Sequence, residues 1–334
     1  MTKVAIIILN WNGKDLLKTF LPSVIQNSKQ AEIIIADNGS NDGSIDFISK
    51  TFPEIRIIDN KENLGFTGGY NKALKEVEAE YYIILNSDIE VSENWIKPII
   101  DLMDEDKNIG VCQPKIRSYI DKSSFEYAGA SGGFIDMLGY PFCRGRIFDS
   151  LEKDNSQYNN TRECFWASGA ALFIRAELFH KFSGFDQEFF AHQEEIDLCW
   201  RLKNAGYKVV VCPESVVYHL GGGTLNKSSA FKTYLNFRNN HYLLYKNYPV
   251  KDYNKIIYIR YLLDYLAAFT FLLKGRVGEF KAVFKALEDF KANRVKFQNK
   301  RNYSNRKTNS ILKRSILLEY HIFNKREFKD LPDL

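Results

Sequence analysis

The sequence predicts an α/β fold with a mostly parallel sheet, followed by a helical C-terminal region. In the first third of the chain, short β-branched runs alternate with segments of helical spacing, which is the pattern of βαβ units. Beyond about residue 226 the composition shifts to Tyr, Phe, Leu, Lys and Arg at helical spacing. We therefore expect one α/β domain over residues 1–225 and a helical region over residues 226–334.

The expected elements follow one another in a regular order. Strands are expected at residues 4–9, 32–36, 55–58 and 82–85 and around residue 111, and helices at 14–27, 44–51, 69–77 and from about residue 92. Residues 116–162 are irregular and predict loops with a few edge strands. A strand at 170–174, helices at 176–182 and 194–205, and a strand at 208–212 complete the pattern.

Composition limits the cellular setting. The five cysteines are widely spaced and contain no Cys-x-x-Cys pair, which favours a reducing, cytoplasmic compartment. The first apolar run, residues 4–9, is too short for the core of a signal peptide and predicts a buried strand instead.

Charge is distributed unevenly along the chain. Residues 274–334 hold 16 Lys and Arg against 7 Asp and Glu, a net +9, whereas residues 1–273 hold 30 against 34, a net −4. A basic tail can attract nucleic acid or acidic lipid. We place a membrane surface ahead of nucleic acid, because an apolar helix precedes this tail.

Polar, turn-forming runs follow three of the expected strands. They are Asn10-Trp11-Asn12-Gly13, Asp37-Asn38-Gly39-Ser40 and Asn86-Ser87-Asp88. Ligands of such sheets bind at the carboxyl ends of the strands. A carboxylate at Asp88 could hold Mg²⁺ or Mn²⁺ against phosphates, whereas Asp37 taken alone equally suits an Asx turn.

Six motifs in a fixed order connect these strand ends to a known family. They are residues 8–13, residues 37–40, Asn63-Leu64-Gly65-Phe66 through Asn71, residues 85–88, residues 194–201 and residues 218–222. Over roughly residues 3–245 the chain resembles glycosyltransferase family 2 enzymes of the GT-A fold, a Rossmann-like mixed, mostly parallel sheet with flanking helices. Within that family it resembles bacterial rhamnosyltransferase-like members.

The resemblance implies roles for individual residues. Donor-binding positions would be Asn10, Asn12, Asp37, Asn63, Gly65, Asn71, Asn86 and Ser87. Asn86 stands where the family pattern Asp-x-Asp has its first Asp, which suggests a weaker metal site. The metal ligands would be Asp88 and, as in some members, His219, with Mg²⁺ or Mn²⁺ as cofactor.

An acidic pair opens the helix expected at residues 194–205. The family places its catalytic base in such a pair, so Glu195 is expected as the base, with Glu194 as the second choice. The helix start also favours acidic residues on electrostatic grounds alone. Asp197 faces away from Glu195 and is expected to pair with Arg201 four residues later.

The family's acceptor-facing loop falls just before the strand at 170–174. Trp166 and Gly169 are therefore expected at the acceptor site, although a tryptophan there equally suits the core. The implied reaction is an inverting single displacement without a Ser or Cys nucleophile. dTDP-rhamnose or a UDP-sugar is the favoured donor, GDP-sugars stay open, and a glycan or lipid-linked glycan of bacterial surface polysaccharide synthesis is the expected acceptor.

Two other functional classes stay open at the level of sequence. Another nucleotide-dependent enzyme on a similar sheet is disfavoured, because the first strand leads into Asn-Trp-Asn-Gly instead of Gly-x-Gly-x-x-Gly. A non-catalytic nucleotide-sugar-binding homologue is disfavoured, because Asp88, the Glu pair and His219 are all retained.

Residues 256–273 are apolar over about the length that crosses a bilayer. Arg260 and Asp264 interrupt this run, and each costs roughly 2.5 to 3.5 kcal/mol at a membrane centre. We expect an interfacial or packed helix with these two residues paired, so that the protein is cytoplasmic with peripheral contact to the inner face of the cell membrane. After this run, six apolar residues at helical spacing mark one face of a further helix, and we expect this face to pack on the catalytic domain. They are Val277, Phe280, Val283, Phe284, Leu287 and Phe290.

Overall fold

The computed structural model describes residues 2–221, 229–301 and 310–332. Its strands are β1 (Thr2–Asn10), β2 (Glu32–Asp37), β3 (Arg56–Asp59), β4 (Ala79–Asn86), β5 (Ile89–Val91), β6 (Ile109–Ser118), β7 (Gly133–Asp136), β8 (Pro141–Cys143), β9 (Arg146–Ile147), β10 (Ser150–Leu151), β11 (Arg162–Cys164), β12 (Ala171–Arg175), β13 (Lys208–His219) and β14 (Ile311–Leu312). Its α-helices are α1 (Lys14–Asn27), α2 (Ser44–Thr51), α3 (Gly65–Ala73), α4 (Lys97–Glu105), α5 (Ala176–Lys181), α6 (Glu194–Asn204), α7 (Ala230–Asn247), α8 (Val250–Leu273), α9 (Val277–Asn293) and α10 (Ile316–His321). Short 3₁₀ turns occur at η1 (Leu74–Glu76), η2 (Gln187–Phe189), η3 (Arg294–Lys300) and η4 (Phe328–Asp330).

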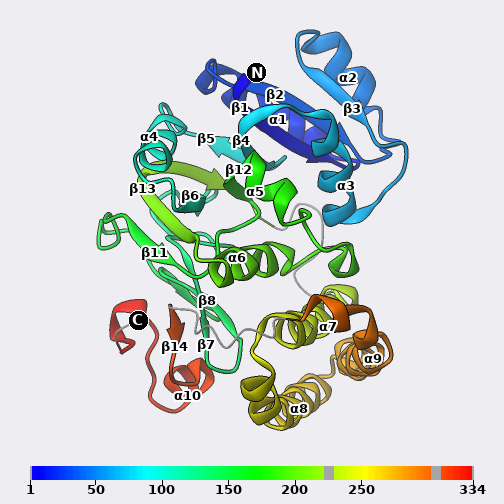
Figure 1. Ribbon diagram of the computed structural model, residues 1–334, viewed down its shortest axis with the longest axis vertical. Helices are drawn as coiled ribbons and strands as arrows, with labels where there is room; N and C mark the ends of the chain where they lie inside the picture. The colour runs from blue at the N-terminus through cyan, green and yellow to red at the C-terminus, as the bar shows by residue number, and fades with distance from the viewer. Residues whose placement is uncertain (1, 222–228, 302–309, 333–334) are drawn as a thin grey trace.

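A nine-stranded mixed sheet forms the centre of the molecule, in the order β11-β13-β6-β12-β4-β1-β2-β3, with β5 also pairing with β13 (Figure 1). Strands β1 to β4 are parallel, and β12 lies antiparallel between β4 and β6. Alternate residues of β1 point to opposite faces, as the strand pleat requires. Ile6 and Ile8 pack with α1, α2 and α4, and Ala5 and Ile7 pack with α3, α5 and α6.

The alternating first third confirms the expected βαβ pattern, with two differences. The helix expected from about residue 92 begins only at Lys97, because β5 and a turn with Asn94 at φ 56° come first and Pro98 stands in the opening turn. The strand expected at 208–212 continues to His219, so this histidine ends a strand paired with both β5 and β6.

The irregular stretch folds into a second, five-stranded sheet in the order β10-β9-β8-β7-β14. Its last strand, β14, comes from the C-terminal region, and the amide of Ile316 donates to Asp136 at 2.9 Å. The C-terminal region is therefore helical over α7 to α9 but returns to complete this sheet (Figure 1). The domain boundary expected at residue 225 lies outside the described residues.

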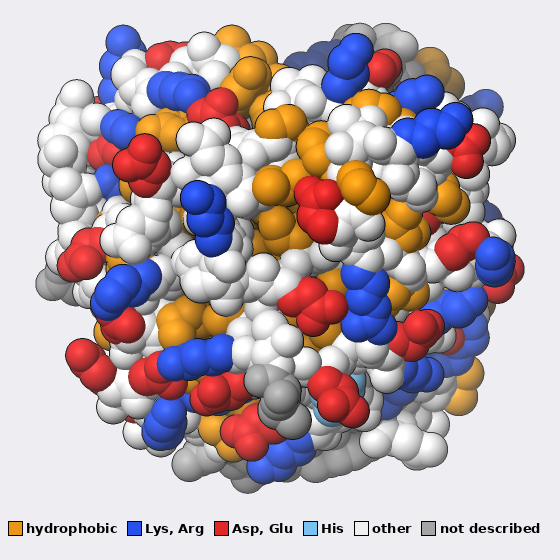
Figure 2. Space-filling view, turned by 90° about the horizontal axis from the view of Figure 1, so that it is seen from above, with side chains coloured by type: hydrophobic (Ala, Val, Ile, Leu, Met, Phe, Trp, Pro, Cys, Tyr) orange, Lys and Arg blue, Asp and Glu red, His pale blue; other side chains and the backbone are white. Residues whose placement is uncertain are grey.

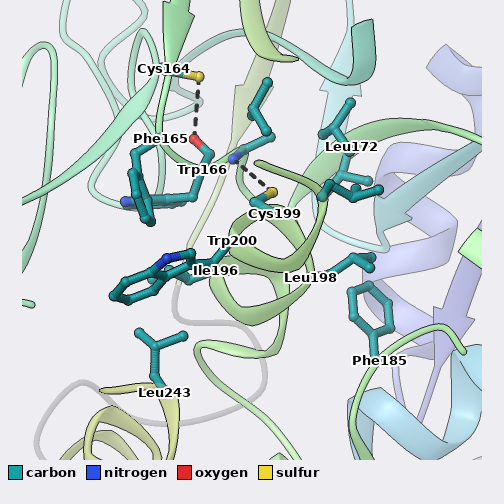
Figure 3. Close-up of a cluster of buried hydrophobic side chains, with 14 of the residues drawn as sticks. Cys164, Phe165, Trp166, Leu172, Phe185, Ile196, Leu198, Cys199, Trp200 and Leu243 are labelled. Carbon is teal, nitrogen blue, oxygen red and sulfur yellow. Dashed lines mark hydrogen bonds between the residues drawn. The ribbon is translucent and has the colours of Figure 1, made fainter. Parts of the chain in front are cut away.

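The segment between β11 and β12 lies on α6 in the core. Trp166 packs there with Cys199 and Trp200 of α6, and Leu243 of α7 reaches the same cluster (Figure 3). The amide of Ala167 donates to the Cys199 sulfur at 3.5 Å. All five cysteines are buried free thiols, and burial raises the pKa of the Cys199 thiol.

Candidate active site

The strand register brings the predicted residues to one edge of the sheet. Asn10 stands opposite Asp37, and Leu9 stands opposite Asn86. Because β12 runs antiparallel, its first residues lie at the same edge, where the amide of Asn86 donates to the Ala170 carbonyl at 2.9 Å. His219 arrives there at the end of β13. This edge is the carboxyl end of the parallel strands, where such sheets bind ligands.

A hydrogen-bonded unit joins the ends of β1 and β2. The buried amide of Asn10 donates to Asp37 at 2.9 Å and to Ser40 at 3.1 Å, while the Ser40 amide donates to Asp37 at 2.8 Å. The backbone of Asn12 donates to the Ser40 hydroxyl at 2.9 Å. Asn10, Asn12 and Asp37 thus lie together, and Ser40 links all three.

The loop before α3 depends on glycine. Gly65 has φ 68°, and a Cβ there would lie 2.5 Å from the Phe190 ring. The side-chain oxygen of Asn63 accepts from the Gly65 amide at 2.9 Å and from Asn38 at 3.0 Å. Asn63 and Gly65 therefore shape the loop that packs against the segment leading into α6.

Two of the predicted site residues, Asn71 and Trp166, form hydrogen bonds within the protein. The Asn71 side chain donates to the Phe185 carbonyl at 2.6 Å and accepts from the Phe185 amide at 2.9 Å, so both of its polar atoms have partners within the protein, and its donor-binding role stays a prediction. Trp166 is 5% exposed, and its indole N–H donates to the Phe134 carbonyl at 2.9 Å. The ring packs in the core with Cys199 and Trp200 of α6 (Figure 3), and its expected place at the acceptor site stays a prediction.

Gly169 does lie at the site. A Cβ on Gly169 would lie 3.2 Å from the Phe66 ring and 3.9 Å from the Cβ of Glu195. The absence of a side chain here leaves room between the loop before α3 and the acidic pair of α6. Ser87 also lies at this edge, and its hydroxyl oxygen is 3.7 Å from where a Cβ on Gly13 would lie.

Asp88 and His219 are neighbours and both are buried. The Nε2 atom of His219 lies 3.1 Å from Asp88 and 3.5 Å from the Asn86 amide nitrogen. On its other side, Nδ1 of His219 lies 3.1 Å from Glu126. Burial opposes charge on His219, but the adjacent carboxylates of Asp88 and Glu126 outweigh it and raise its pKa to about 10.

Glu126 was missed by sequence reasoning, because it lies in the irregular stretch before β7 and belongs to no motif. Its carboxylate accepts from the Ala128 amide, and His219 holds the pKa of this carboxyl below its usual value despite burial. Within the described residues, no group of three or more His, Cys, Asp or Glu side chains has the arrangement of a metal site. Asp88 and His219 therefore form a two-residue pair, with Glu126 behind the imidazole.

Among the carboxyl groups at this edge, the acidic pair at the start of α6, Glu194 and Glu195, has the largest pKa shifts. Glu194 is buried, and burial and the adjacent Glu195 raise its pKa well above the usual value. Glu195 is half-buried, and burial raises its pKa to about 7. One oxygen of each carboxyl has no hydrogen-bond partner among the described residues. Groups of this kind, buried at a ligand edge with shifted pKa values, are typical of active sites.

The loop that leads into this pair, residues 190–193, has a strained backbone and is held by hydrogen bonds from α7. Phe190, His192 and Gln193 all have positive φ, at 65°, 71° and 68°, which costs of order 1 to 3 kcal/mol each. The amide of Asn239 on α7 donates to three carbonyls of this loop, those of Phe189, Ala191 and His192, at 2.8 to 2.9 Å. Helix α7 therefore fixes the backbone that presents the acidic pair, which the sequence did not indicate.

Asp197 is structural, as expected. Its buried carboxylate pairs with Arg201 at 2.8 Å and also with Lys246 of α7 at 2.8 Å. These two cations hold the pKa of Asp197 near 2 despite its burial. The pairing of Asp197 with Arg201 is confirmed, and Lys246 links α6 to α7 behind the site.

The fold is the GT-A fold of glycosyltransferases. The family model of glycosyl transferase family 2 matches residues 5–175, which is just over half of the chain, and the protein therefore belongs to that family. Its activity is glycosyl transfer in glycan biosynthesis, and its similarity within the family is to rhamnosyltransferases.

Two curated relatives illustrate that similarity. N-acetylglucosaminyl-diphospho-decaprenol L-rhamnosyltransferase of Mycobacterium tuberculosis is 26% identical over 61% of this chain and 71% of its own length. The low-salt glycan biosynthesis hexosyltransferase Agl10 of Haloferax volcanii is 22% identical over 71% of this chain and 73% of its own.

Solved structures share the fold at low sequence identity. TarS residues 1–349 of S. aureus in complex with UDP superposes with a TM-score of 0.57 at 16% identity, covering 86% of this chain and 80% of that one. GalNAc-T7 with UDP, GalNAc and Mn²⁺ superposes with a TM-score of 0.53 at 18% identity, and the match spans 65% of this chain but only 43% of GalNAc-T7.

Proposed function

We propose that this protein transfers a sugar, with inversion, from a nucleotide-diphosphate-sugar to an acceptor hydroxyl, with Glu195 as the catalytic base. The observation that carries the proposal is the position of Glu195. Its Cβ would lie 3.9 Å from a Cβ on Gly169, and the next residue, Ala170, accepts from the Asn86 amide at the carboxyl end of β4. A base with a pKa of about 7 is matched to proton removal near neutral pH.

The two glutamates have different parts in this proposal. Glu194 is the more deeply buried, and burial together with the adjacent Glu195 raises its pKa, which favours the uncharged form beside the base. Glu195 accepts the proton of the acceptor hydroxyl as that oxygen attacks the anomeric carbon from the face opposite the leaving diphosphate. The carbon–oxygen bond to the diphosphate breaks in the same step, and no enzyme nucleophile takes part.

Asp88 and His219 fit a divalent cation. They offer one carboxylate oxygen and one imidazole nitrogen 3.1 Å apart, and Glu126 behind Nδ1 is placed as the carboxylate partner that metal-binding histidines usually have. Two protein ligands leave positions for phosphate oxygens and water, the arrangement in which Mg²⁺ is usually bound. Bound there, Mg²⁺ or Mn²⁺ would neutralise the charge that develops on the leaving diphosphate.

The donor and acceptor follow from similarity. dTDP-rhamnose or a UDP-sugar is the proposed donor, supported by the similarity to the mycobacterial rhamnosyltransferase and by the fold shared with TarS. A lipid-linked glycan of surface polysaccharide synthesis is the proposed acceptor, since the mycobacterial relative is named for a diphospho-decaprenol substrate. The proposed location is the cytoplasmic face of the cell membrane.

Calorimetry with a panel of dTDP-, UDP- and GDP-sugars, with and without Mn²⁺, tests this proposal. We expect one donor class to bind, to bind more tightly with Mn²⁺, and to lose that gain in Asp88→Ala. Turnover of the bound donor on glycan acceptors then separates a transferase from a non-catalytic homologue. Binding without turnover would favour the homologue, and no binding under any condition would contradict the proposal.

A further inference from the structure

Helix α8 is apolar on two opposite faces. Among the described helices it is the one long and apolar enough to cross a membrane by length and composition. One face packs on the protein, but the other is exposed along its length, with Tyr258 at 77% and Leu273 at 86% exposure. The exposed large apolar side chains of α8 are Tyr258, Ile259, Leu262, Leu266, Phe269, Leu272 and Leu273.

These side chains form one stripe. At 100° per residue they all fall within about 140° of helical rotation, so they share one side of α8. A helix at the surface of a soluble protein normally turns a polar face to water, and a helix apolar all round is normally covered on every side. No charged residue interrupts the exposed positions between Tyr258 and Leu273.

The charged residues of α8 show which side faces the protein. Arg260 and Asp264 are buried, 3.3 Å apart, and confirm the expected pair. Arg260 donates to the Leu138 carbonyl at 2.6 Å, and Asp264 pairs with His241 of α7 at 2.6 Å. A spanning arrangement would break these contacts and place two charges in hydrocarbon, so α8 stays on the protein with its apolar stripe outward.

Basic side chains border the stripe. Lys251 and Lys255 stand at its N-terminal end, and Lys274 follows its last residue. Beside it, α8 and α9 enclose an open groove of about 520 Å³ with Tyr265 and Phe284 among its lining residues. Three further lysines line the same groove, Lys281, Lys285 and Lys291, together with Glu288.

The end of the molecule that lies opposite α8 is different. Figure 2 views the molecule from the end that carries α1 and α2, where acidic and basic side chains are scattered among neutral and apolar ones. Helix α10, with exposed Leu318, lies with α8 at the other end, and exposed Ile322 and Phe323 follow it (Figure 1). An apolar stripe of this length, bordered by positive charge, matches the chemistry of an anionic membrane surface.

We propose that the exposed stripe of α8 lies flat on an anionic lipid bilayer, with the bordering lysines on lipid phosphates. The apolar side chains enter the boundary between headgroups and acyl chains, while Arg260 and Asp264 remain within the protein. This docking surface is independent of the donor and of the catalytic base. It would bring the domain to the membrane in one orientation.

Vesicle flotation of the purified full chain tests the proposal. We expect binding to vesicles of phosphatidylcholine with phosphatidylglycerol, weaker binding at high salt, and little binding to phosphatidylcholine alone. The variant Leu262→Glu/Leu266→Glu/Phe269→Glu should bind roughly tenfold or more weakly. Because these side chains are exposed, circular dichroism and nucleotide-sugar calorimetry should match the wild type, which separates this test from that of the catalytic proposal.

A matched control substitutes an equally exposed apolar residue elsewhere. Ile120→Glu, at 81% exposure in the loop after β6, should bind vesicles like the wild type. Unchanged binding by the triple variant would overturn the proposal. So would a wild-type dimer in sedimentation velocity that the triple variant abolishes, because a second copy would then cover the stripe. Retention on vesicles in alkaline carbonate would also overturn it, in favour of a spanning helix.

Discussion

The catalytic edge and the α8 surface differ in what their buried charged side chains do. At the edge, Asp88, His219 and Glu194 are buried, and their pKa values are shifted by burial and by neighbouring charged groups, Asp88 and His219 by each other and Glu194 by Glu195. On α8 the charges of Arg260 and Asp264 are also buried, but there they are paired and the surface is left apolar. Burial therefore shifts the pKa values of reactive groups at the catalytic edge, whereas on α8 it keeps the charged side chains away from the exposed surface.

The comparison is tested most strongly at the acidic pair. Glu195→Gln removes the proposed base and should lower kcat by about 10² to 10⁴ while donor binding is retained. Glu194→Gln replaces a carboxyl that is already neutral and should lower kcat by less than about tenfold. Steady-state kinetics on the identified donor measures both. A larger loss in Glu194→Gln than in Glu195→Gln would reverse the assignment of the base.

The second test breaks the buried pair of α8. Arg260→Met leaves Asp264 buried without its cation and should destabilise the protein by about 3 to 5 kcal/mol, measured by urea unfolding. Arg260→Met/Asp264→Leu should recover much of that loss, since both charges are gone. Lys255→Met, on the exposed side, should change stability by less than about 0.5 kcal/mol. Equal stability of Arg260→Met and the wild type would show that the pair is not needed to hold α8.

The third test concerns the link between α7 and the strained loop. Asn239→Ala leaves three carbonyls of residues 189–192 without this donor and should cost about 1 to 3 kcal/mol of stability. The loop would then relax, so kcat should fall about tenfold while the Kd of the donor stays unchanged. Asn254→Ala, an exposed asparagine on α8, is the control. A normal kcat in Asn239→Ala would show that the loop holds its conformation alone.

The smallest expected effect is the pH dependence of Glu195. Activity should rise with pH through about 7 as Glu195 loses its proton. Since folding raises its pKa from 4.5 to about 7, the folded state binds the extra proton in that window, and its contribution to stability is lost as pH rises through it. Glu195→Gln should therefore be about 1 to 2 kcal/mol more stable than the wild type at pH 8. Equal stability at pH 8 would contradict the raised pKa.

Several site residues were predictable because their local pattern suffices. A short β-branched strand followed by Asn, Asp, Gly or Ser predicts a strand end with a turn, and the sheet type assigns that end to the ligand edge. Asn10, Asp37, Asn86 and Asp88 were found in this way. The helix expected near residue 92 failed because a three-residue strand, β5, has too little sequence to show a period of its own.

Partners across the fold were not predictable. Glu126 carries no motif and reaches His219 because β6 and β13 lie side by side. Trp166 and Asn71 had the residue types of ligand contacts, yet their polar atoms bond to the Phe134 carbonyl and to the Phe185 backbone. Residue type alone does not tell whether a polar atom is used inside the protein or left for a ligand.

By itself the sequence determined the order of the elements, the family and the short polar segments at the strand ends, because these depend on period, turn chemistry and local motifs. Only the tertiary structure decided which of those polar groups stay available to a ligand. It also decided that Glu194 is more deeply buried than Glu195, and that Asn239 holds the loop before them. In the same way it decided that α8 turns an apolar stripe outward. The physical reason is that burial, pKa shifts and hydrogen-bond partners arise from residues distant in the chain, and the sequence does not place these side by side.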